Sequence, residues 1–287
     1  MRESPRCRPW PETTLRIISL SLAHLGLGLI LIQALVGLRE VGRGFFTLCG
    51  WSGVGLTVFG WMFSGSTAHP AGEGAAPWAI AVVSALSFAV GWSLLKAKRR
   101  DLAAPFHHGA GALAGAAVFV QGWWLALSQP AASAPGSHGL SIAAWTGADF
   151  VLSAALLGGV TVAMVLGHWY LVQPGLSIVP LNRLAWVFIV VLALRIIEEA
   201  AGAAGAISSG AMSLSPPAGE IVPFPLLILF QRALFGLAAP LVLAPLVYKT
   251  VTMRSTMSAT GLLYVAVALV WVGEFLSKYL LLPLRMT

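Results

Sequence analysis

Long apolar stretches follow one another along almost the whole chain, and short polar segments separate them. A helix needs about 20 apolar residues to cross a hydrocarbon core of about 30 Å. Stretches of this length recur eight times in the sequence. We expect membrane-spanning helices near residues 15–38, 44–65, 77–95, 107–128, 140–171, 182–207, 221–248 and 258–282.

Composition points to the same class of protein. Of the 287 residues, 58% are hydrophobic and 9% are charged, whereas soluble domains carry about 25% charged residues. A surface so poor in charge is solvated by lipid, where backbone polar groups must be hydrogen-bonded inside helices. The sequence therefore predicts an all-α integral membrane protein, a bundle of about eight transmembrane helices with short loops. A basic polar tail, residues 1–14, precedes a single transmembrane domain, residues 15–287.

Basic residues in the loops predict the orientation. The odd-numbered loops, together with Arg183 at the start of the sixth span, contain nine lysines and arginines, and the even-numbered loops contain none. Because basic loops stay in the cytoplasm, this asymmetry places both termini outside, although the arginines of the tail favour the opposite orientation. We expect a bacterial inner membrane as the location and the lipid bilayer as the first partner. Basic residues confined to loops and ends do not indicate nucleic-acid binding.

Six ionisable residues interrupt the apolar stretches. A charge at the bilayer centre costs about 2.5–3.5 kcal/mol on insertion scales, and such residues pair with one another or mark a pathway. Arg195, Glu198 and Glu199 have the i, i+3, i+4 spacing that places side chains on one helix face. Three more are expected at similar depths on neighbouring spans, namely Asp149, Arg232 and Glu274.

The balance of these charges suggests their roles. One arginine neutralises one carboxylate of its own helix, so the second needs another partner, for which Arg232 is the natural candidate. The six residues comprise two cations and four carboxylates. Unless another cation enters, at least one carboxyl is expected to be protonated or to face water, and it can then relay protons. We expect Glu198, Glu199 and Glu274 in proton relay, Arg195 and Arg232 as charge partners, and Asp149 at the outer mouth. The alternative is a structural salt-bridge network that only fixes helix packing.

Histidines form a second set of candidates. Two histidines on facing helices can ligate a b-type haem. His108 and His168 are expected at similar depths on adjacent spans, and His24 lies within the first span. These three are candidate contacts for haem b or quinone. The alternatives are interfacial residues for the two at span ends, and for His24 a helix–helix hydrogen bond or a place in the charged cluster.

The motifs that would name a reaction do not occur in this sequence. It has no nucleotide-binding fingerprint, zinc-protease signature or nucleophile elbow, and its two isolated cysteines predict no metal site. The favoured hypothesis is a subunit of a respiratory-type redox complex that handles quinone, protons or both, while partner subunits carry the redox centres. Whether the chain is itself an enzyme stays open. The alternatives are a proton- or ion-coupled transporter and a haem b-binding or haem-processing membrane protein.

Overall fold

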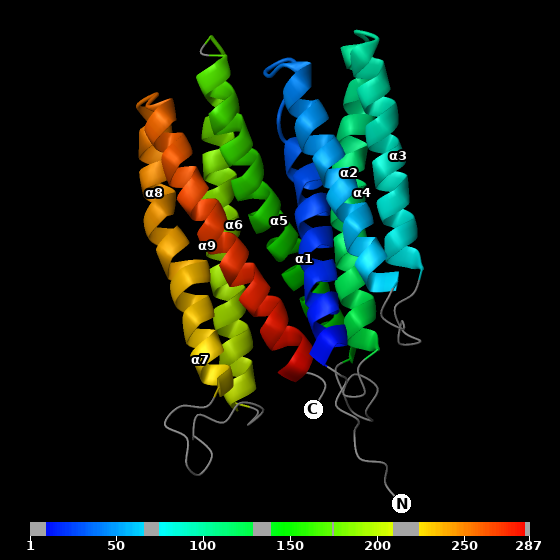
Figure 1. The fold of residues 1–287 in the computed structure, drawn as a ribbon, viewed down its shortest axis with the longest axis vertical. Coiled ribbons are helices and arrows are strands. Elements are labelled where there is room, and N and C mark those ends of the chain that lie inside the picture. The colour runs from blue at the N-terminus through cyan, green and yellow to red at the C-terminus, as the bar shows by residue number, and fades with distance from the viewer. Residues whose placement is uncertain (1–9, 66–74, 129–138, 174, 209–223, 285–287) are drawn as a thin grey trace, which may run out of the picture. The chain divides into compact units, whose positions relative to one another are not determined.

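In the computed structural model the described residues are almost entirely helical (Figure 1). The structure describes residues 10–65, 75–128, 139–173, 175–208 and 224–284. These ranges contain no strand, so the all-helical prediction is confirmed for them. In chain order they form α1 (Trp10–Gln33), α2 (Arg43–Gly65), α3 (Ala76–Lys96), α4 (Arg100–Leu127), α5 (Gly139–Val172), α6 (Val179–Ser208), α7 (Phe224–Gln231), the π-helix η2 (Arg232–Ala238), α8 (Ala239–Thr252) and α9 (Thr256–Leu284).

Seven of the described helical stretches are long and apolar enough to cross a membrane, which suggests a membrane-embedded protein. The stretch from α7 through η2 to α8 counts as one of them. α6 is not among the seven, although its 30 residues extend roughly 45 Å. Three of its charged residues, Arg195, Glu198 and Glu199, lie within little more than one turn.

Helix ends differ from the predicted span ends. α1 is shifted towards the N-terminus relative to the predicted span 15–38, and its first turn contains Pro11, which is tolerated there because the first helical N–H groups have no intrahelical partner. α4 begins at Arg100, before the apolar stretch, with Asp101 in its first turn, where a carboxylate interacts favourably with the helix dipole. Hydropathy locates the apolar part of a helix but not the polar turns that continue it.

The chain forms two compact units. Unit 1 comprises Met1–Gly158 and Leu281–Thr287, and unit 2 comprises Gly159–Leu280. The first boundary therefore falls within α5, between two consecutive glycines.

α1 is the central helix of unit 1. It packs against α2 and α4, and α3 packs against α4. Residues 23–30 of α1 are all buried, so its neighbours cover this stretch of the helix on every side. Glycines allow the closest approaches, because a Cβ on Gly26 would lie 2.5 Å from the carbonyl oxygen of Gly53 on α2, and a Cβ on Gly158 of α5 would lie 2.7 Å from the Cα of Gly28. At both crossings the backbones touch directly.

In unit 2, α6 packs against α8, and α8 continues directly from η2. Within η2 the helix widens, so that the N–H of Ala239 donates to the carbonyl of Leu234, five residues earlier. Pro240 follows at once. A proline has no N–H, and in a regular helix its ring meets the carbonyl four residues before it. The helix thus has a wide turn just before this proline, whereas Pro245 is accommodated inside α8.

The crossing of α1 and α5 can be tested with two neighbouring glycines. Gly158→Ala places a methyl group against the backbone of Gly28, and we expect a loss of about 1–3 kcal/mol of stability because backbone atoms cannot move aside. Thermal unfolding in detergent micelles measures it. Gly159→Ala is the matched control, since a Cβ there meets no atom within 4 Å, and it should unfold at or above the wild-type temperature. Equal unfolding temperatures for the two variants would show that the helices do not cross at Gly158.

Candidate functional site

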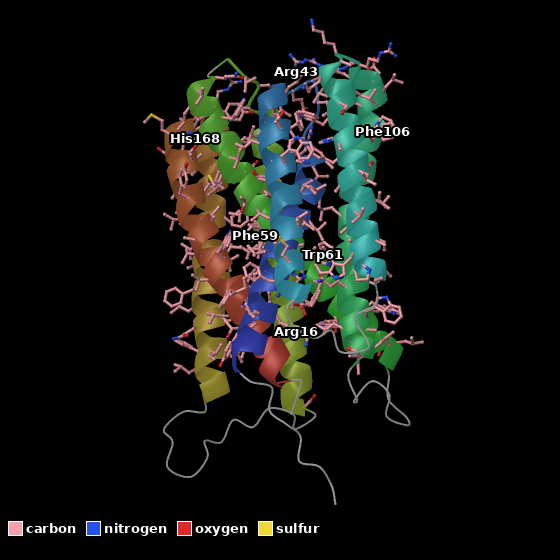
Figure 2. The ribbon with its side chains drawn as sticks, turned by 45° about the vertical axis from the view of Figure 1, so that its right-hand side comes forward. Arg16, Arg43, Phe59, Trp61, Phe106 and His168 are labelled. Carbon is pink, nitrogen blue, oxygen red and sulfur yellow. The ribbon has the colours of Figure 1, made fainter. Side chains whose placement is uncertain are left out.

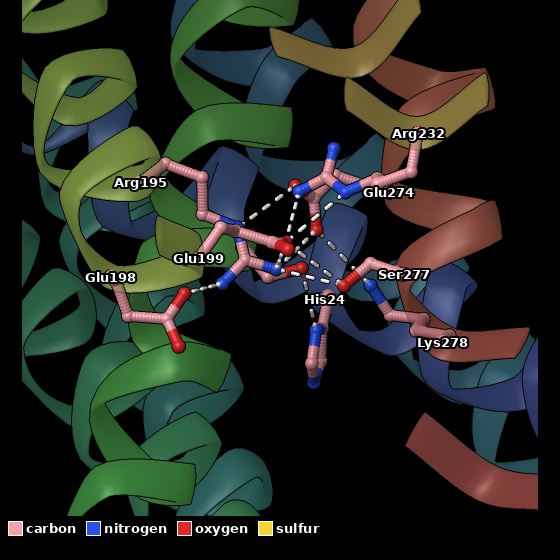
Figure 3. Close-up of polar contacts among 9 residues, drawn as sticks. His24, Arg195, Glu198, Glu199, Arg232, Glu274, Ser277 and Lys278 are labelled. Carbon is pink, nitrogen blue, oxygen red and sulfur yellow. Dashed lines mark hydrogen bonds and ion pairs between the residues drawn. The ribbon is translucent and has the colours of Figure 1, made fainter. Parts of the chain in front are cut away.

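Unit 2 contains a group of six charged side chains, which we call the charge cluster (Figure 3). Each member forms an ion pair with at least one other member. Three are cations and three are carboxylates, so the formal charges balance. The members are Arg195, Glu198 and Glu199 of α6, Arg232 of η2, and Glu274 and Lys278 of α9.

Glu274 lies at the centre of the charge cluster, with a side-chain exposure of 1%. Its Oε1 accepts from Arg195 Nε at 3.2 Å and from Arg232 Nη2 at 2.9 Å. Its Oε2 accepts from Arg195 Nη2 at 3.4 Å, and Lys278 Nζ lies 3.7 Å from the same oxygen. An isolated charge is strongly disfavoured in apolar surroundings, and here the carboxylate is shared by three cations.

Glu199 links the same two arginines through a second carboxylate. Its Oε1 accepts from Arg232 Nη2 at 2.8 Å and from Arg232 Nε at 3.1 Å, and Arg195 Nη2 lies 3.3 Å away. The hydroxyl of Ser277 on α9 accepts from Arg195 Nη2 at 3.0 Å and donates to Glu199 Oε1 at 3.4 Å. Arg195 and Arg232 are therefore bridged twice, once by each carboxylate.

Exposure differs across the charge cluster. Glu198 accepts from Arg195 Nη1 at 2.7 Å and is 14% exposed, and Glu199 is 19% exposed. By contrast, Arg195, Arg232 and Glu274 are exposed by 1% each. The two carboxylates of α6 thus form an accessible edge, and the arginines separate this edge from the enclosed Glu274.

Local helix geometry explains how the residues meet. On α6 the charges stand at i, i+3 and i+4, and α9 repeats this spacing with Glu274, Ser277 and Lys278. Residues so spaced share one face of a helix. Each of the two helices therefore presents a single polar face to the cluster, and Arg232 completes it from η2.

Two glycines bring η2 and α9 into backbone contact beside Arg232. A Cβ on Gly236 of η2 would lie 2.6 Å from the Cα of Gly273 on α9, and a Cβ on Gly273 would lie 2.7 Å from Arg232 Nη1. The missing side chains make room for the guanidinium group. Arg232 Nη1 is itself buried and has no hydrogen-bond partner among the described residues.

The structure brings together five of the six charged residues predicted from the sequence, and it adds Lys278. This third cation changes the charge count, because the described charge cluster has as many cations as carboxylates and lacks the predicted surplus of carboxylates. Asp149 is half-buried on the part of α5 that belongs to unit 1. Lys278 could have been recognised from its i+4 spacing to Glu274, the same signal that grouped the charges of α6.

The three candidate histidines lie in different surroundings. His24 is buried in unit 1, where its Nδ1 and the hydroxyl of Ser153 are hydrogen-bonded at 3.2 Å and Phe150 contacts the ring edge-on. His108 is exposed on α4, and the neighbouring His107 faces inwards and donates from Nε2 to the carbonyl of Gln33 at 3.0 Å.

His168 is exposed near the end of α5, in unit 2 (Figure 2). In the described part of the chain, no group of three or more His, Cys, Asp or Glu side chains is arranged to hold a metal ion.

Comparison with known proteins adds no family, because no family model matches the sequence and no curated protein matches it significantly. The interpretation of the charge cluster therefore depends on its geometry.

Removal of one central arginine tests whether the charge cluster holds unit 2 together. Arg195→Ala removes the cation that pairs with Glu198, Glu199 and Glu274, and breaking a buried pair in this way destabilises a protein by about 3–5 kcal/mol. We expect poor accumulation in membranes and a large fall in unfolding temperature. Arg183→Ala, an exposed position on the same helix, should change stability by about 0.5 kcal/mol or less. Normal accumulation and unfolding of Arg195→Ala would contradict a role in folding.

The contact between η2 and α9 generates a second prediction. Gly273→Ala should displace the Arg232 guanidinium and push η2 away from α9, with a loss of about 1–3 kcal/mol in stability measured by thermal unfolding. Gly261→Ala on the same helix is the control, since a Cβ there meets nothing within 4 Å. If both variants unfold alike, the glycine contact does not position Arg232.

Proposed function

We propose that the chain crosses the membrane eight times, with α6 as a span, and that its charge cluster handles protons. We further propose that it does so as a quinone-handling subunit of a respiratory-type redox complex in a bacterial inner membrane, with both termini outside. The observation that carries the proposal is the set of interlocked carboxylates and cations on helices that are otherwise apolar.

The two sides of α6 support its membrane crossing. Consecutive residues of an α-helix are rotated by about 100°, so the side opposite the charge cluster can be read from the sequence. That side is an exposed apolar stripe, as expected for a surface in lipid. The stripe consists of Trp186, Val190, Leu194 and Ile197. Charges compensated on one face and apolar side chains on the other make α6 compatible with a membrane.

The order of the groups in the cluster supports proton handling. Arginine stays protonated in proteins, so Arg195 and Arg232 set the charge while the carboxylates exchange protons. A proton that arrives at the partly exposed Glu198 or Glu199 weakens the hold of that carboxylate on Arg195. The same guanidinium also binds Glu274, so a change at the edge alters the charge balance at the centre. Ser277, which accepts from Arg195 and donates to Glu199, offers a hydroxyl on the same path.

An apolar pocket in unit 1 is the observation that favours quinone. The pocket has a volume of about 320 Å³ and lies among side chains of α1, α2 and α3, including Trp61 and Trp78. Pockets for lipid-soluble molecules are largely apolar and have aromatic walls. In this proposal the chain binds the quinone and exchanges its protons, and partner subunits that carry haem or iron–sulfur centres exchange its electrons.

A proton- or ion-coupled transporter is the second candidate, and one observation favours it. η2 interrupts the span from α7 to α8 at Arg232, a residue of the charge cluster. Interrupted helices near the bilayer midplane form the binding sites of many transporters, and π turns occur frequently at functional sites. His108 and His168 are both exposed, so we do not extend the proposal to haem.

Glu198 is the position at which proton handling can be tested without loss of the fold. Because Glu198 is partly exposed, solvent can compensate for the loss of its charge. Glu274→Gln, by contrast, would remove the carboxylate shared by buried cations. We expect Glu198→Gln to unfold like the wild type and to lose proton-coupled turnover by about a hundred-fold or more, the usual contribution of a proton-transfer group. The measurement is quinol oxidation by the purified complex in liposomes that enclose a pH-sensitive dye.

Asp101→Asn, which removes an exposed carboxylate of unit 1, is the control and should turn over normally. Normal turnover of both Glu198→Gln and Glu199→Gln would exclude the charge cluster from proton transfer.

Extraction in mild detergent distinguishes a subunit of a redox complex from a transporter. Cytochrome or iron–sulfur subunits in stoichiometric amounts support the redox complex, and a lone chain that still takes up protons supports the transporter.

A further inference from the structure

Unit 1 carries a dense group of exposed cations on two neighbouring turns, which we call the basic patch. The turn between α1 and α2 and the turn between α3 and α4 are joined, because Arg39 pairs with Asp101 at 2.5 Å and Arg43 donates to the carbonyl of Lys96 at 3.3 Å. Six cations stand against two carboxylates, Glu40 and Asp101, which leaves a net charge of +4. The cations are Arg39, Arg43, Lys96, Lys98, Arg99 and Arg100.

The basic patch surrounds a shallow open groove of about 650 Å³. Guanidinium and ammonium groups around such a groove present several charged donors at once, an arrangement that suits phosphate oxygens. Asp101 is the acidic side chain at the groove, and Arg39 neutralises it. The groove is lined by Arg39, Lys98, Arg99, Arg100, Asp101 and Leu102.

Lys98 occupies a backbone position that favours glycine. Its φ angle is 62°, in the left-handed region. The N–H of Arg99 donates to the carbonyl of Leu94 and the N–H of Lys98 to that of Leu95, which is the usual hydrogen-bond pattern of a glycine-terminated helix. The chain therefore holds a cation at the groove where glycine would fit the turn better.

Apolar side chains continue directly from the basic patch. Leu102 and Phe106 on α4 and Leu48 on α2 are exposed, and the ammonium group of Lys96 lies 4.6 Å from the ring centre of Trp92. Figure 2 shows Arg43 at the end of the unit and Phe106 farther along its flank. Charged donors at the end and apolar side chains beside them match a molecule with a phosphate group and hydrocarbon chains. A free phosphate would use the donors alone.

We propose that the basic patch binds the head group of an anionic phospholipid, whose acyl chains lie along the exposed apolar side chains of α4. Clusters of lysine and arginine next to membrane helices bind anionic lipids in this way. The inference rests on the membrane embedding of the proposed function and not on its proton chemistry. Loss of lipid binding with intact turnover, or the reverse, therefore distinguishes the failure of one proposal from the failure of the other.

The experiment uses the full chain in nanodiscs of phosphatidylcholine with increasing fractions of phosphatidylglycerol. Native mass spectrometry counts the phosphatidylglycerol molecules that the released protein retains. We expect preferential retention by the wild type, and a fall in affinity of roughly five-fold for each cation removed in the variant Lys98→Gly/Arg99→Gln/Arg100→Gln. Lys98→Gly also relieves the left-handed backbone, so the variant should unfold at or near the wild-type temperature.

Arg254→Gly is the matched control, because Arg254 has a φ angle of 57° in the turn between α8 and α9 and belongs to unit 2. It should retain phosphatidylglycerol like the wild type. Equal retention by the triple variant, or equal retention of phosphatidylcholine and phosphatidylglycerol by the wild type, would overturn the proposal. Complete displacement of the lipid by inorganic phosphate would also overturn it, in favour of a site for soluble phosphate compounds.

Discussion

Compensation of buried charge is the constraint on which unit 2 depends. In lipid, apolar helices gain no hydrophobic free energy by leaving their solvent for one another, so polar contacts and close packing decide which faces meet. Arg195 and Arg232 would be strongly unfavourable without Glu199 and Glu274. α6, η2 and α9 are therefore held in one register by ion pairs, and their apolar side chains pack around that arrangement.

The same network can serve packing and chemistry, and exposure separates the two. A fully enclosed set of paired charges can only stabilise helix packing, because no proton can reach it. Here Glu198 and Glu199 retain some exposure, while Glu274 is sealed behind the arginines. Solvent exposure therefore decreases from Glu198 and Glu199 to Glu274 through shared hydrogen bonds, as expected for a proton path and not for a purely structural ion-pair network. This decrease is the main reason to propose a role for the charge cluster beyond stability.

The sequence predicted much of this arrangement because two signals are strong. Apolar length located the helices, and the i, i+3, i+4 spacing put the charges of α6 on one face. Lys278 is missing from the predicted set of charges, although it follows Glu274 at the same i+4 spacing. His107 and His108 are adjacent on one helix, and their side chains are about 100° apart. The surrounding apolar pattern does not show which of the two faces inwards. Helix ends and the wide turn of η2 depend on tertiary contacts.

The wide turn also has a consequence for the second half of its span. A π turn contains one residue more than an α turn, so it acts as a single-residue insertion. Residues after it are rotated by about 100° relative to an uninterrupted helix. Arg232, with its ion pairs, lies at the start of the wide turn, and Tyr248, which contacts Trp186 on α6, lies after it. The two side chains therefore point in directions that differ by about 100° from those in a regular helix. Deletion of one residue within η2 would restore a regular helix, and either the upstream or the downstream set of contacts would then face away from its partners.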